Sequence, residues 1–402
     1  MKAWSIGLLA AGSIATGALA ADIIVSAQDG KFVRVDGRAT FPEPAPPDSL
    51  VVIDASQFPP KVKGTVEGIE HTVQGPPQAV AVTPDGKLAI IAAPTRYDYA
   101  AKKELFDNFL QIVDIEASPP KVIAKVDVGA HPNGLAINRD GTLLLAAAHD
   151  GAVKVLAIEG KNVRMLGDVK VGEKRLAGIS FTHDGKAAIV AQRDENGAAV
   201  LSVDGTKVTL TNEKISTGVT PYAVDVSSDG KWAVIGNTGV QGMAGLAGRT
   251  AGDADVVTLV DVSQRPFRAA QQISVPNTPE GIAISPDGRY VAVSSMAGSN
   301  LTPDNPGRNK LGKVTLFEIR DGVAAKVSDV QGGEAAQGVV FTQDGRYVLL
   351  QMDVEKAMPF MPCATASWST PASASSSRLD LSRSARCRAD DRWPERGQSP
   401  PP

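Results

Sequence analysis

The chain has very little cysteine. Its 402 residues include only Cys363 and Cys387, and both lie in the last forty positions. Disulfide bonds therefore cannot cross-link the first 360 residues, and that part of the chain must be stabilised by packing alone. No C-x-x-C-H motif occurs, so covalent haem attachment is not expected and we predict no cofactor.

An excess of charge of either sign is also missing. The 41 Lys and Arg residues nearly balance the 44 Asp and Glu residues, and the basic residues form no cluster. Nucleic-acid-binding surfaces depend on such clusters, so we expect no nucleic-acid partner. Outside the first twenty residues, no apolar run approaches the roughly 20 residues that a membrane span needs.

The first twenty residues have the features of a secretory signal peptide. Lys2 supplies a positive start, residues 6–18 are apolar or small, and Ala18-Leu19-Ala20 fits the A-x-A cleavage pattern. The alternative is an N-terminal membrane anchor. The favoured interpretation predicts a signal peptide at residues 1–20 and a periplasmic or secreted protein, with no membrane span after cleavage.

An internal repeat dominates the rest of the chain. An apolar, alternating run leads to a turn that is Asp-Gly in every copy, and a second such run follows. Six copies are clear: QAVAVTPDGKLAII, NGLAINRDGTLLLA, AGISFTHDGKAAIV, YAVDVSSDGKWAVI, EGIAISPDGRYVAV and QGVVFTQDGRYVLL. A weaker seventh copy, DIIVSAQDGKFVRV, comes first. Asp-Gly suits the positive φ angles of tight hairpins, and the alternation is that of strands.

Two further apolar strands follow most copies, as in SLVVIDA and KVKGTVE. Four strands per unit at this period predict an all-β, seven-bladed β-propeller of four-stranded antiparallel blades. The only helix-like stretch, residues 99–109, is expected to be an insertion within one blade.

Segments such as HPNGLAINRDG and TPEGIAISPDGRYVAVSS resemble the YVTN-type repeat. That family, like the related lactonase-like propellers, forms seven-bladed rings, so the resemblance implies the same fold over residues 22–355. The matching residues belong to turns and packing positions, so they do not specify an activity.

The repeat pattern stops within the seventh unit. Its first two strands are present, but from residue 358 a tail rich in Ser, Ala, Arg and Pro replaces the outer pair. We predict a signal peptide at 1–20, a propeller at 21–357 with an incomplete last blade, and an aberrant or disordered tail at 358–402. The tail is either a natural disordered segment or the product of a shifted reading frame.

Polar residues are predicted to surround the mouth of the central channel. In a propeller the strand before each Asp-Gly turn is innermost, and its first residue lies on the opposite face. That position, eight residues before each repeat glycine, is occupied by Asp22, Gln78, Asn133, Ala177, Tyr222, Glu280 and Gln337. Their role is either to hydrate the mouth or to bind a ligand there.

Loops on the same face supply further candidates. His131 and His149 lie at the two ends of one hairpin, and Arg96 and Arg193 follow second strands. Histidine suits acid–base chemistry and arginine suits carboxylates or phosphates. The spacing of the histidines does not suggest a metal site. His71 is also expected on this face, and His183 on the opposite one.

Three long insertions, residues 94–108, 238–255 and 297–312, are expected beside these candidates. Three interpretations remain open. The first is a binding or scaffold protein that takes an unknown small molecule or protein on this face. The second is a lactonase-like hydrolase of a small cyclic ester, with His131, Glu280 and Arg193 as candidate catalytic residues, although no G-x-S-x-G motif occurs. A redox propeller is the weakest of the three.

Overall fold

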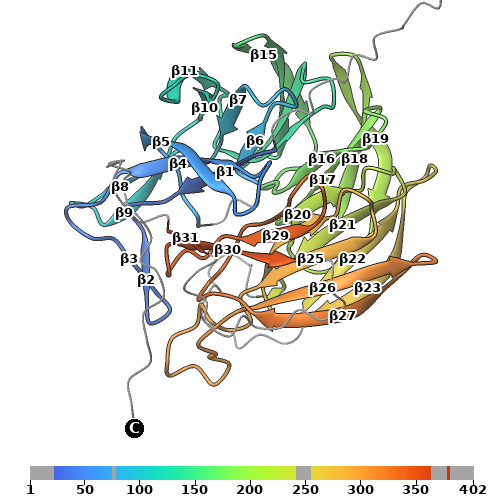
Figure 1. The fold of residues 1–402 in the computed structure, drawn as a ribbon. Helices are drawn as coiled ribbons and strands as arrows, with labels where there is room; N and C mark the ends of the chain where they lie inside the picture. The colour runs from blue at the N-terminus through green and yellow to red at the C-terminus, as the bar shows by residue number, and fades with distance from the viewer. Residues whose placement is uncertain (1–21, 75–77, 241–254, 364–377, 381–402) are drawn as a thin grey trace, which may run out of the picture.

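The computed structural model describes residues 22–74, 78–240, 255–363 and 378–380, and over these residues the fold is entirely strands and turns. Seven small antiparallel sheets follow one another around a common centre (Figure 1). The predicted seven-bladed propeller is confirmed. No helix long and apolar enough to cross a membrane occurs among these residues.

We number the blades in chain order and give the strands of each blade from the channel outwards. Blade 1 contains β1 (Ile23–Gln28), β4 (Asp48–Asp54) and β5 (Lys61–Ile69). Blade 2 contains β6 (Val80–Val82), β7 (Leu88–Ile91), β10 (Phe109–Asp114) and β11 (Lys121–Asp127). Blade 3 contains β12 (Pro132–Ile137), β13 (Leu143–Ala148), β14 (Ala152–Glu159) and β15 (Asn162–Lys170).

The remaining blades repeat this order. Blade 4 contains β16 (Ile179–Phe181), β17 (Ala187–Ala191), β18 (Ala198–Asp204) and β19 (Lys207–Ile215). Blade 5 contains β20 (Pro221–Val226), β21 (Trp232–Asn237), β22 (Asp255–Asp261) and β23 (Arg268–Val275). Blade 6 contains β24 (Pro279–Ile284), β25 (Tyr290–Ser295), β26 (Lys313–Arg320) and β27 (Val323–Gln331). Blade 7 contains β28 (Val339–Phe341), β29 (Tyr347–Leu350), β30 (Ala357–Pro362) and β31 (Arg378–Asp380).

The Asp-Gly pairs of blades 2 to 7 form the inner hairpin turns, as predicted. In blade 2 the Thr83 hydroxyl donates to Asp85 Oδ1 at 2.6 Å, and the Lys87 N–H donates to the same oxygen at 3.2 Å. Gly86 follows with a φ of 69°, which a residue with a side chain rarely adopts. Asp therefore fixes the turn through its carboxylate, and Gly supplies the left-handed conformation.

Apolar side chains fill the spaces between neighbouring blades. One buried cluster brings together Ile189 of blade 4, Ile235 of blade 5 and Val291 of blade 6. Another joins Ile24 of blade 1 to Leu349 of blade 7. Since each blade buries both faces of its sheet against its neighbours, the core runs around the whole ring.

Blade 1 differs from the prediction. The Asp29-Gly30 pair does not form an inner hairpin, because β1 pairs directly with β4, with Val25 opposite Val52. The chain between them forms a separate hairpin of β2 (Val33–Val35) and β3 (Arg38–Thr40). β1 therefore occupies the place of a second strand, and the described part of blade 1 has no innermost strand.

The last blade also differs from the prediction. A third strand, β30, begins at Ala357 and pairs with β29, and the short β31 pairs with β30. Residues 358–362 were expected to be the start of an aberrant or disordered tail. They form a strand because Ala357, Met358, Phe360 and Met361 are apolar and pack into the ring. The incomplete blade is thus the first one and not the seventh.

The prediction of a helix-like insertion at residues 99–109 was wrong as well. β8 (Thr95–Asp98) and β9 (Lys103–Phe106) form a hairpin, with Tyr97 opposite Glu104. Lys102 at the turn has a positive φ of 50°, which ends any helical continuation. The first twenty residues and the segment 241–254 lie outside the described residues, as do most of the predicted tail positions.

Where the ring closes, blades 1 and 7 meet without sharing a strand among the described residues (Figure 1). Apolar packing of Ile24 and Val51 on Leu349 and Phe360 holds this junction. Phe58 adds a ring stack on Tyr347 with centroids 4.2 Å apart. We refer to this junction as the seam.

Candidate functional site

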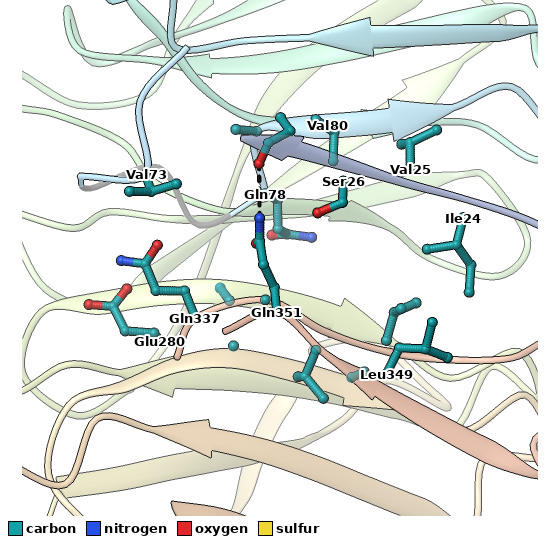
Figure 2. A pocket seen from close by; sticks show the side chains of 18 of the residues that line it. Ile24, Val25, Ser26, Val73, Gln78, Val80, Glu280, Gln337, Leu349 and Gln351 are labelled. Atoms are coloured by element: carbon teal, nitrogen blue, oxygen red, sulfur yellow. Dashed lines mark hydrogen bonds between the residues drawn. The ribbon is translucent and has the colours of Figure 1, made fainter. Parts of the chain in front are cut away.

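The face on which the inner strands begin, here called the mouth face, has a cavity of about 380 Å³. Its lining comes from the inner strands around the channel. The predicted ring residues Gln78, Tyr222, Glu280 and Gln337 all contribute to it. Figure 2 shows Glu280 and Gln337 on one side of this space, with Gln78 and Ser26 across from them. Four of the predicted ring residues therefore converge on one concavity.

Gln78 connects opposite sides of the ring. Its side-chain Oε1 accepts the backbone N–H of Val224 at 3.0 Å, although the two residues belong to blades 2 and 5. The backbone carbonyl of Gln78 also accepts the N–H of Leu135 at 2.9 Å. Gln78 thus helps to fix the channel as well as lining it.

Three ionisable side chains meet below the mouth. Tyr222 is buried and donates its hydroxyl hydrogen bond to Glu280, and the Arg193 guanidinium lies over the Tyr222 ring, 4.7 Å from its centroid. Burial raises the pKa of Glu280, although the nearby Arg193 and the Tyr222 hydroxyl oppose that rise. Burial also lowers the pKa of Arg193. The sequence proposed these three residues separately, and the fold brings them together.

The two candidate histidines form an aromatic cluster and do not line the cavity. His131 and His149 have ring centroids 4.5 Å apart, and the Phe106 ring lies 4.9 Å from His131. His131 Nδ1 bonds the carbonyl of Asp107 at 2.9 Å. Burial lowers the pKa of both histidines, that of His149 to about 3. Neutral imidazoles in this position serve mainly to attach the β8–β9 hairpin to blade 3.

Arg96 and Asn133 are also placed away from the cavity. Arg96 is exposed and forms a two-pronged ion pair with Asp107, with nitrogen–oxygen distances of 2.7 and 2.8 Å. Asn133 is buried and donates to the carbonyl of Leu176 at 3.0 Å. Asp22 lies on the opposite face, where its carboxylate accepts the N–H of Gln343 at 2.8 Å. The sequence misplaced Asp22 because it assigned Asp29-Gly30 to an inner hairpin.

Insertions cover part of the mouth face and contact one another. Phe41, which follows the β2–β3 hairpin, stacks on Tyr97 of β8 with centroids 3.7 Å apart. Gly37 at the tip of β2–β3 lies so close to the carbonyl of Leu301 that a Cβ there would collide with it. The segments 31–47, 94–108 and 297–312 therefore form a continuous border. The sequence identified the last two but missed the first.

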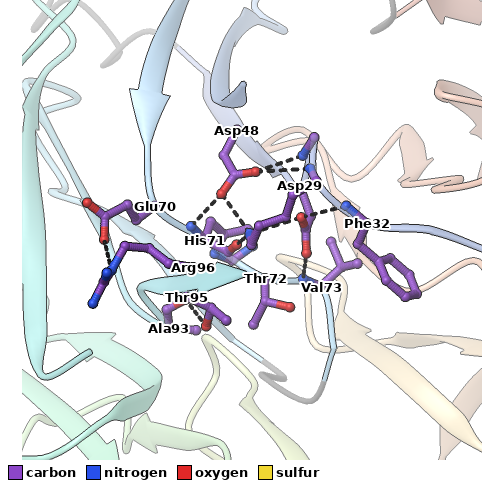
Figure 3. A network of polar contacts seen from close by, with 12 residues as sticks. Asp29, Phe32, Asp48, Glu70, His71, Thr72, Val73, Ala93, Thr95 and Arg96 are labelled. Atoms are coloured by element: carbon purple, nitrogen blue, oxygen red, sulfur yellow. Dashed lines mark hydrogen bonds and ion pairs between the residues drawn. The ribbon is translucent and has the colours of Figure 1, made fainter. Parts of the chain in front are cut away.

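A buried ion network lies beside this border (Figure 3). Lys31 Nζ contacts Asp48 Oδ2 at 2.7 Å and Asp29 Oδ1 at 3.0 Å, and it donates to the carbonyl of His71. All three charged side chains are at most 8% exposed. Asp48 also accepts the N–H groups of Gly30 and His71, at 2.9 and 3.0 Å. The network attaches the end of β1 to the segment that enters blade 2.

His71 lies on the mouth face, as expected, and is among the residues that line the cavity, although its side chain is buried against the network. Its Nδ1 lies 3.3 Å from the carbonyl of Ala92, and burial lowers its pKa to about 4. His183 lies on the turn face as predicted, 3.0 Å from an Arg139 nitrogen.

Two functional candidates were missed. Asp225 in β20 lines the cavity, and burial raises its pKa to about 6 although its carboxylate accepts the N–H groups of Val226 and Ile284. An aspartate within the apolar strand YAVDV was the available signal. Arg34 of β2 is close enough for Glu280 to raise its pKa, against the lowering by burial. Its proximity depends on the unexpected β2–β3 hairpin.

No group of three His, Cys, Asp or Glu side chains that could hold a metal occurs within the described ranges. The cavity lining offers the Glu280 carboxyl, the Tyr222 phenol and several glutamine amides, and the Arg193 guanidinium lies behind Tyr222. Such a set can bind a small polar molecule through hydrogen bonds and charge. Whether the predicted residues bind a ligand stays a prediction.

Solved structures with the same architecture support the fold. A structure described as a putative 6-phosphogluconolactonase from Bacteroides fragilis has a TM-score of 0.61 and 14% identity, covering 90% of this chain and 96% of that one. A corresponding one from Bacteroides uniformis has a TM-score of 0.59 and 15% identity, covering 85% and 92%. Hydrazine synthase from Kuenenia stuttgartiensis has a TM-score of 0.55 and 21% identity, covering 73% and 78%.

No family model matches the chain, and no curated protein sequence matches it closely. At these identities the structural similarities establish the propeller fold and nothing about the activity.

Proposed function

We propose that the chain is an exported β-propeller that acts as a binding or scaffold module through its mouth face. The observation that carries this proposal is the convergence of Glu280 and Tyr222 on the cavity, with the Arg193 guanidinium lying against the Tyr222 ring behind them. Buried ionisable groups in a concavity are expensive to maintain, and they cluster at functional sites. The bordering insertions offer additional contact surface to a larger partner.

The chemistry of the mouth favours a small, polar, uncharged or zwitterionic ligand. Glu280 with Tyr222 can accept and donate hydrogen bonds, while Arg193 and Arg34 supply positive potential nearby. Gln78 and Gln337 add amide groups that bond hydroxyls or carbonyls equally well. An anionic ligand would be repelled by Glu280, and a cationic ligand would be repelled by Arg193 and Arg34.

The test is an untargeted mass-spectrometric search for small molecules that co-purify with the full chain. Glu280→Gln keeps the shape of the side chain but removes its charge, so we expect it to lose the retained compound. Glu159→Gln is the matched control, because Glu159 is exposed on the outer part of blade 3 and its one ion pair within the described part of the chain is with the exposed Arg164. Equal retention by both variants would move the binding site away from the mouth.

Export is part of this proposal and rests on residues 1–20. Fractionation of cells that express the full chain should place the protein outside the cytoplasm, and N-terminal sequencing should find Ala21 as the first residue. A cytoplasmic protein that retains Met1 would contradict it.

A lactonase-like hydrolase is the alternative. It is favoured by the raised pKa of Glu280, which suits a general acid or base, and by Arg193 beside it as a stabiliser of developing negative charge. His131, the third candidate, is held by Phe106 and Asp107 and does not line the cavity. Turnover of a panel of lactones by the wild-type chain, lost in Glu280→Gln, would establish this function. No turnover of any lactone would rule it out.

A further inference from the structure

Arg34 of β2 is a largely buried cation that has no carboxylate in contact with it. Its Nη1 donates to the Gly37 carbonyl at 3.0 Å, and its guanidinium carbon lies 5.4 Å from the centre of the Phe32 ring. Its Nε is buried without a hydrogen-bond partner, and no ion pair involves Arg34 in the described part of the chain. Because a cation withdrawn from water is unfavourable unless it is paired, Arg34 lacks the counter-charge that its position requires.

Two carboxylates near Arg34 are bound by other cations. Asp353 and Glu334 are close enough to oppose the lowering of the Arg34 pKa that burial causes. Asp353, however, pairs with Lys356 at 3.0 Å. Glu334 likewise pairs with Arg308 at 2.9 Å. Neither carboxylate is therefore left to pair with Arg34.

The free edge of the Arg34 guanidinium suits a carboxylate. Only Nη1 donates a hydrogen bond, and Nε and Nη2 have no partner over the described ranges. Arg96 uses the same two nitrogens to hold Asp107, at 2.7 and 2.8 Å. Arg175 uses them to hold Asp194, both at 3.2 Å. This edge presents two parallel N–H groups, which match the two oxygens of one carboxylate.

The β2–β3 hairpin holds Arg34 beside the cavity. The N–H of Phe32, two residues earlier, donates to Asp29 Oδ1 at 3.1 Å, and Asp29 Oδ2 accepts the N–H of Val73 at 3.2 Å (Figure 3). Val73 lines the cavity. At its tip the hairpin contacts the segment 297–312. Since the hairpin is held at both ends, Arg34 is positioned before any ligand arrives, which lowers the cost of binding.

Glu280 supplies the opposite charge in the same mouth. It lines the cavity beside Gln337, and its carboxyl accepts the Tyr222 hydroxyl hydrogen bond (Figure 2). Glu280 also opposes the lowering of the Arg34 pKa by burial, so the two charges lie near each other. They form no direct ion pair. A cation and an anion are thus close together but not in contact.

We infer that the ligand of the mouth is a small zwitterion, whose carboxylate binds the Nε–Nη2 edge of Arg34 and whose ammonium group binds Glu280. This inference rests on the function proposed above and narrows its ligand class. A zwitterion adds no net charge, and each of its groups meets an opposite charge. An uncharged ligand would leave Arg34 without a counter-charge, and a hydroxy acid would bring an anion near Glu280 without a cation of its own.

The test measures the binding of amino acids of increasing chain length, from glycine to 6-aminohexanoate, to the purified full chain by isothermal titration calorimetry. The carboxamide of each compound lacks the carboxylate, and the corresponding hydroxy acid lacks the ammonium group. We expect the wild-type chain to bind at least one of the amino acids. It should bind the carboxamide and the hydroxy acid of that compound about 10- to 100-fold more weakly, the range that a hydrogen bond to a charged group is worth.

Three variants assign each half of the ligand to its residue. Arg34→Met keeps an apolar side chain but removes the guanidinium, so it should bind the amino acid no more tightly than its carboxamide. Glu280→Gln should bind the amino acid no more tightly than its hydroxy acid. Arg38→Met is the matched control, because Arg38 is exposed on β3 of the same hairpin, and it should bind as the wild type does.

The inference is overturned if the wild-type chain binds none of the amino acids, or if Arg34→Met still prefers the amino acid to its carboxamide. Retention of a co-purifying compound that Glu280→Gln loses but Arg34→Met keeps would also overturn it, and would leave the function proposed for the mouth standing. Because the carboxamide comparison needs no altered protein, the test stands even where Arg34→Met fails to fold.

Discussion

Replacing Lys31 with Met should destabilise the ring strongly. Lys31 is the only cation in contact with the buried carboxylates of Asp29 and Asp48 within the described residues. Its removal leaves two negative charges in a site that is almost closed to water. Breaking a buried pair in this way costs about 3–5 kcal/mol. That loss corresponds to a fall of roughly 1 M or more in the midpoint of urea unfolding.

The loss of stability in Lys31→Met should depend on pH, in a direction that the pKa of Asp48 determines. Burial raises the pKa of Asp48 even though Lys31 opposes the rise, so loss of Lys31 must raise it further. A carboxyl whose pKa is higher in the folded state than in the unfolded state destabilises the folded state once the pH rises above the unfolded pKa. At lower pH the carboxyl is protonated in both states, and the destabilisation disappears. The deficit of Lys31→Met should therefore be largest at pH 7 and shrink as pH falls toward 4.

Lys87→Met is the matched control, since Lys87 lies 3.8 Å from Asp85 with both side chains at least half exposed. Exposed pairs of this kind contribute about 0–1 kcal/mol. Urea unfolding followed by circular dichroism at pH 7 and pH 4 measures both variants. A loss in Lys31→Met no larger than that in Lys87→Met, or one unchanged between the two pH values, would refute the reasoning.

Three other outcomes are expected. Because the pKa of Asp225 is about 6 in the folded state, the wild-type chain should lose at most about 3 kcal/mol of unfolding free energy as pH rises from about 4 through about 6. Asp225→Asn should remove that loss, and equal slopes of stability against pH in both chains would contradict this. Gly178→Ala should cost about 1–3 kcal/mol in urea unfolding, since the added carbon would lie 2.5 Å from the Tyr222 carbonyl oxygen; an unchanged midpoint would show that the two strands can separate freely. Arg96→Met should cost no more than about 1 kcal/mol despite its two short contacts with Asp107, and a larger thermal shift would mean that this pair supports the hairpin.

The sequence was sufficient for the architecture because the repeat has local causes. In five copies the Asp carboxylate accepts the turn hydrogen bonds and the following Gly supplies the positive φ, whereas in blade 3 Asn138 Oδ1 accepts the N–H groups of Thr142 and Leu143. The flanking alternation determines the strands. The same local signal was misleading at Asp29-Gly30. There the carboxylate is used by Lys31, Phe32 and Val73 and not by a turn, and those partners come from more than one element.

The candidate site was predictable where position in the ring determines it. Tyr222 and Glu280 follow from the spacing of the repeat, and both line the cavity. His131 and Arg96 failed to reach it because Asp107, in an insertion without a repeat pattern, binds both of them. Contacts between insertions depend on their three-dimensional path, and no local pattern in the sequence encodes that path.

The seam also has a mechanical consequence. When the first and last blades of a ring share a strand, backbone hydrogen bonds hold the ring closed. In this ring the described residues of blades 1 and 7 are joined at the seam by side chains such as Ile24 and Phe360. Thermal fluctuations that widen the channel should therefore separate blades 1 and 7 at the seam and leave the other six junctions between blades closed. Backbone amides of β1 should then exchange with deuterium earlier than those of β13 or β21, which lie inside complete sheets.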